Sequence, residues 1–394
     1  MKNILEELDP VVLGEELKHA RNKSGMTQEE VSKLLDVART TVTAIEKGER
    51  RIRPDELIKL SEAFNKSVHE FLRVKKPIES FQVQFRAAYK RSEKENDEIN
   101  SIIDEFEQLC RDYLELEELI YGEPWQNYPV EYKKSGSNIE QNAEIIAIRE
   151  RNRLGLGDGP IPMLRDILEQ DVGLRIFYLK MPAIFSEMYN YHDYLGGCLA
   201  VNANHPEVRR RWSMSHGYAH FLVHRKGPVV DSDEKHVRLD KNEQFAETFS
   251  KHFLMPANSV LKKYDDIKKS KNKFTIADLI MTAHYYGVSL EAMTRRLEEM
   301  KLIDLGTWEK LKSHNFRMKE EQKKLNIEEL PQRDDMLPVR YQYLVLYAFE
   351  KELITEGQFA KFLRKNRVEA RDFAMENRIE IDDDFEFEQS LSVL

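Results

Sequence analysis

Two histidines spaced four residues apart are the first feature of this sequence that could do chemistry. They lie in the stretch RWSMSHGYAHFLVH, where His216 and His220 would fall one turn apart on the same face of a helix. Two imidazoles placed in this way can bind one zinc ion together. Such a pair predicts little by itself, because many pairs of this spacing are ordinary surface or core residues.

A carboxylate that could complete the site lies downstream, in the stretch NEQFAETFSKHFLMP (residues 242–256). Its apolar residues recur at helical spacing, and Glu243 and Glu247 share another face of that helix. One of these two carboxylates, added to both imidazoles, would give three protein ligands and leave a fourth position open. The two segments together are therefore far more specific than either one.

This pairing resembles the ImmA/IrrE family of zinc metallopeptidases. Further stretches carry the resemblance: LGGCLAVNANHPEVRRRW (195–212), FLMP (253–256) and IMTAHYYGVSLEAMTRRLEEMKLI (280–303). The resemblance covers about residues 140–305 and implies a zincin-like metallopeptidase domain. It implies that His216, His220 and Glu243 hold Zn²⁺, with Glu247 as the reserve ligand.

The family motif, H-E-x-x-H, is broken at Gly217, which gives HGYAH. The glutamate of that motif does not bind the metal; it accepts a proton from the zinc-bound water and passes it to the leaving amine. Glycine can do neither, and general acid–base catalysis contributes roughly 10²–10⁴-fold to the rate. We therefore predict little or no peptidase activity. The chain is either a natural pseudo-enzyme or an inactivated one, and the intact surroundings favour a recent or engineered loss.

The N-terminal part of the chain has the pattern of a helix-turn-helix. Thr27 and Glu30 form a capping box, a short turn follows at 36–38, and a second short helix would run from Arg39 to about Gly48. Short polar residues and one arginine on the outward face of the second helix suit the major groove of DNA. The cationic run that follows suits phosphate contacts.

The stretch 17–64 is similar to the XRE (Cro/CI-type) helix-turn-helix family, which implies a five-helix domain that binds a double-stranded operator as a dimer. The resemblance also implies an internal ion pair between Arg21 and Glu46. Ala38 stands where the family often has a capping serine. The expected DNA-binding residues are Gln28, Arg39, Thr40, Thr41, Thr43, Lys47, Arg50 and Arg51.

The sequence pattern predicts the elements that must position these residues. Together they indicate a mostly α fold with a small β-sheet, an α+β architecture. Helices are expected at 140–153, 162–171, 208–224, 239–254, 275–286, 289–299, 308–325, 338–352 and 356–376, and strands at Gly173–Leu179 and Gly197–Asn202. The expected domains are 1–75 (helix-turn-helix), 76–139 (linker with a long helix), 140–305 (metallopeptidase-like) and 306–394 (helical, with an acidic tail).

The long helix of the linker has a heptad seam. Its apolar side chains alternate in steps of three and four at Ile99, Ile102, Phe106, Leu109, Tyr113, Leu116 and Ile120. Two interpretations are equally favoured: a coiled-coil arm that supplies the contact of a homodimer, or a long helix packed within its own chain.

Composition excludes several classes of protein. Of the 394 residues 41% are hydrophobic and 33% charged, which predicts packed domains rather than a disordered chain. We expect no membrane span and no signal peptide, and two cysteines cannot form a disulfide framework, so a cytoplasmic protein is expected. The net charge of −9 lies outside residues 1–75, which are neutral, so a DNA contact would be local.

Three functions compete at this stage. The first, which Gly217 and the fused architecture favour, is a transcriptional regulator whose central domain senses a signal or binds a partner. The second is a zinc metallopeptidase that cleaves a repressor or partner protein in a DNA-damage, mobile-element or phage-defence response. The third is an antitoxin or defence-system component that holds a protein partner.

Overall fold

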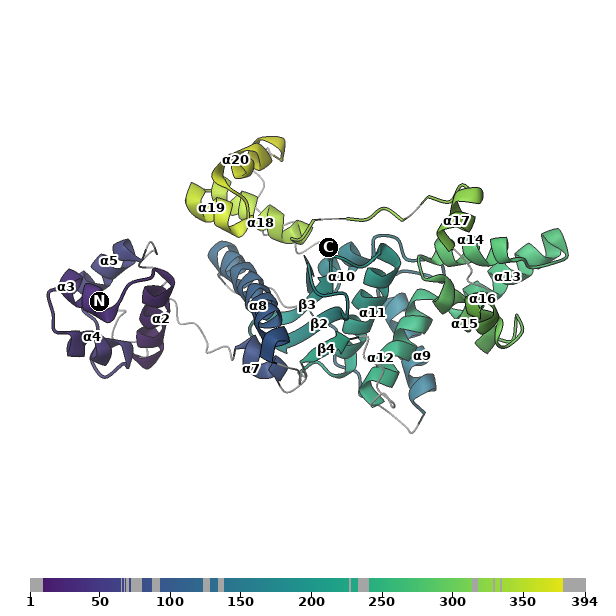
Figure 1. Cartoon of the computed structure of the whole chain (residues 1–394), viewed down its shortest axis with the longest axis horizontal. Coiled ribbons are helices and arrows are strands. Elements are labelled where there is room, and N and C mark those ends of the chain that lie inside the picture. Colours follow the sequence, from purple (N-terminus) through teal and green to yellow (C-terminus); the bar gives the residue numbers. More distant parts are fainter. Residues whose placement is uncertain are drawn as a thin grey trace. The chain divides into compact units, whose positions relative to one another are not determined.

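The computed structural model describes residues 10–64, 66, 68, 71, 80–86, 93–122, 128–133, 138–226, 228–232, 241–313, 318–328, 330–333 and 335–377. The chain divides into two compact units, with the boundary after Glu79 (Figure 1). Each unit has a hydrophobic core of its own. No helix within the described ranges has both the length and the apolar character needed to cross a membrane.

The first unit is a bundle of short helices around one core. Its elements are α2 (Pro10–Lys23), α3 (Gln28–Leu35), α4 (Arg39–Glu46) and α5 (Pro54–Ala63). The predicted capping box of Thr27 and Glu30 begins α3, whereas α4 follows Ala38 with no side-chain cap. The fifth helix expected from the sequence would lie beyond residue 64, where few residues are described.

The second unit contains a four-stranded sheet. Its strands are β1 (Arg175–Leu179), β2 (Phe185–His192), β3 (Gly196–Asn202) and β4 (Val229–Ser232), in the order β1-β3-β2-β4. The β1–β3 pair is parallel and the β2–β3 and β2–β4 pairs are antiparallel, so β2 is an interior strand. The predicted strands are confirmed as β1 and β3, while β2 and β4 were not expected.

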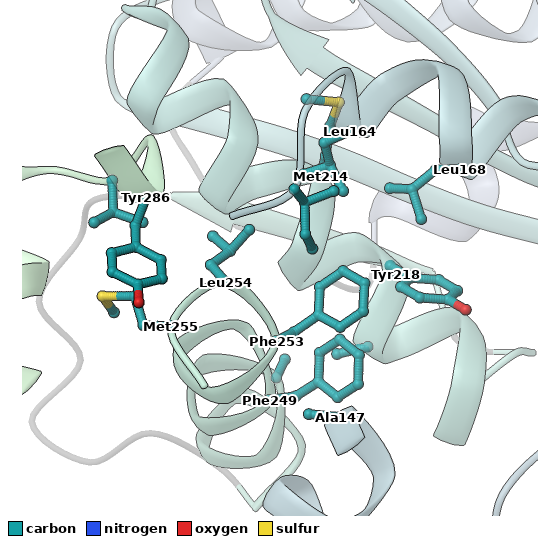
Figure 2. Close-up of a cluster of buried hydrophobic side chains, with 14 of the residues drawn as sticks. Ala147, Leu164, Leu168, Met214, Tyr218, Phe249, Phe253, Leu254, Met255 and Tyr286 are labelled. Carbon is teal, nitrogen blue, oxygen red and sulfur yellow. The ribbon is translucent and has the colours of Figure 1, made fainter. Parts of the chain in front are cut away.

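Four helices build the core beside this sheet. They are α9 (Ile139–Arg153), α10 (Leu164–Gln170), α11 (Glu207–Val223) and α12 (Lys241–Leu254), all close to the predicted bounds. Helix α11 packs on β2 and β3, and α12 packs against both α11 and α9. Figure 2 shows Phe249 and Phe253 of α12 in this cluster with Tyr218 of α11 and Ala147 of α9. The two motif-bearing helices are thus in direct contact.

Further helices follow along the chain: α13 (Ala257–Lys271), α14 (Ile276–Tyr286), α15 (Leu290–Glu299), α16 (Thr307–Ser313), α17 (Met318–Lys324), α18 (Val339–Glu350), α19 (Glu356–Phe362) and α20 (Arg367–Glu376). Helix α13 was not predicted. The prediction of a single helix over 356–376 is wrong. The chain forms α19 and α20 there, because Arg364 adopts a left-handed conformation and Asn366 caps a new helix.

The heptad helix is part of the second unit. It is α8 (Glu93–Tyr121), and α7 (Phe81–Arg86) packs against it. Phe106 contacts Phe81 and Phe177, and Tyr113 contacts Phe177 and Tyr341. From Ile99 to Leu116 the seam side chains are all buried by this same chain, and Ile120 is half-buried. Of the two interpretations, packing within the chain is confirmed, and the seam is not free to form a coiled-coil dimer.

Buried ion pairs hold the C-terminal helices to α8. Glu117 is fully buried and pairs with Arg175 of β1 and with Arg340 of α18. Asp112, five residues earlier on α8, pairs with Arg364 at a distance of 2.7 Å. Since removing one partner of such a pair leaves an uncompensated buried charge, these contacts specify how α8 is placed in the unit.

Candidate functional site

Helix α11 places both motif histidines on its buried face toward α12. His216 and His220 are 2% and 1% exposed, and their ring centroids lie 4.9 Å apart. Tyr218 of the same helix contacts Phe249 and Phe253 of α12 and donates its hydroxyl to Glu150 of α9. Burial raises the pKa of Tyr218 well above its ordinary value, so it stays protonated and serves as an anchor between helices.

Glu243 in the first turn of α12 reaches both imidazoles. Its Oε2 lies 3.2 Å from Nε2 of His216, and its Oε1 lies 3.5 Å from Nε2 of His220. One ligand atom from each of the three residues falls within 4.8 Å of the others. Two ligands at about 2.1 Å from a tetrahedral zinc ion lie about 3.4 Å apart, so the donor set fits this metal.

The reserve ligand, Glu247, does not join this group. It is exposed one turn further along α12 and lines a cavity of about 570 Å³. Trp212, one turn before His216 on α11, and Ala292 of α15 line the same cavity. Of the two carboxylates, Glu243 is the one that the structure brings to both histidines.

A second carboxylate in the site was missed by sequence reasoning. Glu187 of β2 is fully buried, and its Oε1 lies 2.9 Å from Nδ1 of His216. No local signal in FSEMYN indicates this role, and β2 itself was not predicted. Carboxylates placed on the far nitrogen of a ligating histidine fix its orientation and raise its basicity.

Gly217 lies where α11 comes close to the sheet. A β-carbon at this position would lie 2.5 Å from Cδ1 and 3.1 Å from Cδ2 of Leu199, and 3.4 Å from Oε1 of Glu187. Leu199 is itself fully buried on β3. The missing side chain is thus matched by close packing, not by empty space.

We expect Gly217→Ala to destabilise the protein although alanine is the better helix former. The gain in helix propensity is about 1 kcal/mol, whereas crowding a packed core costs roughly 1–3 kcal/mol, so a net loss of about 1 kcal/mol should follow. Chemical denaturation measures it. The matched control is Gly357→Ala in α19, where a β-carbon meets nothing closer than 3.8 Å, and this change should stabilise by about 0.4–1 kcal/mol. An equal gain at both positions would contradict the packing argument.

The predicted DNA-binding residues lie on α3, α4 and the segment after α4. Arg39, Thr40, Lys47 and Arg51 are exposed, and Thr41 and Thr43 are half-buried. Arg50 is half-buried and donates two hydrogen bonds to Glu56. The predicted ion pair between Arg21 and Glu46 is confirmed at 2.5 Å, and Glu46 also accepts from Gln28. Gln28 is therefore held at the start of α3 by the internal ion pair.

Comparison with family models finds one match in each of the two units. A model described as helix-turn-helix matches residues 17–71, and one described as IrrE N-terminal-like domain matches residues 169–298. The chain therefore contains a helix-turn-helix domain followed by an IrrE-like domain. No curated protein matches it at a significant level. The IrrE-like match contains both motif helices, α11 and α12, and the sheet strands that support them.

Proposed function

We propose that this helix-turn-helix and IrrE-like fusion is a transcriptional regulator whose IrrE-like domain binds Zn²⁺ and acts as a sensor or partner-binding module, without cleaving peptides. One observation carries the proposal. His216, His220 and Glu243 converge on a point that suits zinc, whereas Gly217, between the two histidines, has no side chain to move a proton.

The chemistry of the site follows from its residues. When bound, zinc would polarise an oxygen atom of water or of a ligand. His216 and His220 hold their nitrogens toward Glu243, and Glu243 is about one-quarter exposed, so the site is open on that side. Without a proton acceptor at position 217, a leaving amine would not be protonated by α11. The site is thus suited to holding a ligand.

The N-terminal unit supports the DNA-binding part of the proposal. Arg39 and Thr40 are exposed at the start of α4, the recognition helix, and Lys47 and Arg51 are exposed just after it. Arg39 and Thr40 are suited to base edges, and Lys47 and Arg51 to phosphates. We propose that two copies bind a pseudo-palindromic operator, as helix-turn-helix dimers do.

A second candidate function is a metallopeptidase that cleaves a repressor or partner protein. The observation that favours it is the buried carboxylate of Glu187, which lies beside the position where the motif glutamate would begin. In the arrangement described, Glu187 contacts His216 at Nδ1, the nitrogen turned away from Glu243. This geometry supports orientation of the histidine, so the regulator remains the preferred function.

The experiment that tests the proposal selects an operator from random duplexes and measures its affinity with and without zinc. We expect steep salt dependence, because several phosphates are contacted, and a change of roughly 5–150-fold in affinity on zinc loading, the usual range of coupling between sites. The zinc-loaded protein should leave helix-turn-helix repressor proteins intact in the same buffer. Cleavage of such a repressor protein would refute the proposal, and so would equal affinity for selected and scrambled duplexes.

A further inference from the structure

We infer that Glu187 is a positioning residue of the metal centre, and that Glu187 and Gly217 form a matched pair. Strand β2 supplies a carboxylate that holds His216, and position 217, which has no side chain, lies directly beside this carboxylate. The inference rests on the zinc site of the proposed function. It assigns a role to a strand that the motif does not include.

The contact with His216 determines which nitrogen faces the metal. Oε1 of Glu187 lies 2.9 Å from Nδ1, while Nε2 of the same ring lies 3.2 Å from Glu243. A carboxylate accepts a hydrogen bond, so the ring proton is held on Nδ1 and the lone pair remains on Nε2. A histidine binds zinc through its unprotonated nitrogen, and Glu187 therefore prepares His216 for this role.

Strand β2 supports both histidines of α11 in register. Glu187 and Tyr189 are two residues apart on the strand and so share one face, about 6.8 Å from each other along the strand. His216 and His220 are four residues apart on the helix, which corresponds to about 6 Å. Glu187 contacts His216, and Tyr189 stacks on His220 with the rings inclined by 25° and their centroids 6.4 Å apart. Each of the two histidines is thus contacted by one side chain of β2.

A fully buried carboxylate on an interior strand is unfavourable unless a partner compensates for the lost water. Ser186 and Met188, its neighbours on β2, are also buried, and Glu187 pairs in register with Val201 of β3. A carboxylate at this position therefore costs stability that an apolar side chain would not. Its contact with a ligand histidine gives a functional reason for that cost.

Gly217 completes the pair. A β-carbon there would lie 3.4 Å from Oε1 of Glu187 and within 2.5 Å of Leu199. A glutamate at 217 would thus start beside the carboxylate of Glu187, and two like charges in one buried place repel each other. We therefore expect that Gly217→Glu alone would not restore a working motif. If the glutamate had been lost recently from an otherwise unchanged site, the same substitution should restore it.

The first test measures zinc affinity by competition with a chromophoric chelator, together with the protonation of His216 by long-range proton–nitrogen NMR of histidine-labelled protein. Glu187→Ala should weaken zinc binding by roughly 10–100-fold and remove the proton from Nδ1 of His216 in part of the molecules. Glu187→Asp should restore part of the zinc affinity and part of the protonation of Nδ1 of His216. Glu247→Gln, which changes a carboxylate one turn from Glu243, is the matched control and should leave both unchanged.

The outcomes separate the inference from the proposed function. If wild-type protein binds no zinc but Glu187→Ala still alters the protonation of His216, the zinc site fails and the positioning role stands. If zinc binds and Glu187→Ala changes neither affinity nor protonation, the positioning role is overturned. Loss of stability alone, with unchanged zinc affinity and an unchanged His216 signal, would also overturn it.

The second test is a double-mutant cycle between the paired positions. Thermal unfolding is compared for wild type, Glu187→Ala, Gly217→Glu and the variant with both changes. We expect Gly217→Glu to lower the Tm strongly and Glu187→Ala to recover part of that loss, because the second carboxylate is then gone. Strictly additive shifts would overturn the pairing. If Gly217→Glu fails to fold, Gly217→Gln completes the cycle, and it should show weaker coupling because it adds no charge.

Discussion

Changing both His216 and His220 to alanine is expected to abolish zinc binding. Zinc-binding free energies of roughly 10–16 kcal/mol, divided equally among four ligands, give about 2.5–4 kcal/mol for each ligand. Two lost ligands then weaken the affinity by roughly 10⁴–10⁶-fold. Elemental analysis after dialysis should fall from about one zinc per chain to none. Both side chains are almost fully buried.

His284→Ala is the matched control for this measurement. Its ring nitrogen is 2.9 Å from the backbone oxygen of Glu328, and it does not belong to the group of His216, His220 and Glu243. Zinc content should stay at about one per chain. Retention of zinc by the double variant of His216 and His220 would show that the metal lies elsewhere, and equal loss in His284→Ala would point to unfolding.

The second large effect is expected on DNA. Arg39 and Thr40 are exposed at the start of α4, so replacing both by alanine leaves the core of the unit unchanged. Specific base contacts contribute about 1–3 kcal/mol each, and the loss should lower the affinity for the selected operator by roughly 10²–10⁴-fold. Binding to unrelated duplexes should change far less. Fluorescence anisotropy with both duplexes measures the difference.

Arg51→Ala is the companion variant, because Arg51 is exposed beyond the recognition helix. A phosphate contact carries no sequence information, so this change should weaken binding to all duplexes alike and reduce the slope of log affinity against log salt by about one. A uniform loss in the Arg39 and Thr40 variant, or a sequence-dependent loss in Arg51→Ala, would contradict the assigned roles.

The convergence of the three proposed ligands was predictable because the spacing of the histidines carries geometric information. A spacing of four residues places His216 and His220 on one face of a helix, and the resemblance named Glu243, which the structure brings within 3.5 Å of both rings. Glu187 was not predictable. It touches His216 across 29 residues of sequence, and the strand that carries it is buried on both faces, so it lacks the alternation that reveals a half-exposed strand.

The heptad seam shows the limit of periodicity. A row of apolar side chains in steps of three and four indicates that one side of a helix is covered. It does not indicate which part of the protein, or which partner, covers it. Here the cover comes from Phe81, Phe177 and Tyr341, which are spread over more than 250 residues of the same chain. Helix breaks such as the one at Arg364 were equally hidden, because a left-handed arginine has no residue signature.

The burial of this seam has a consequence for how the protein responds to dilution. A helix that needs a second copy to cover its apolar side unfolds as the subunits dissociate, so its stability depends on protein concentration. Helix α8 is covered by its own chain, and the buried acids Asp112 and Glu117 are compensated by arginines of that chain as well. A single molecule can therefore keep this helix formed, however scarce the protein is.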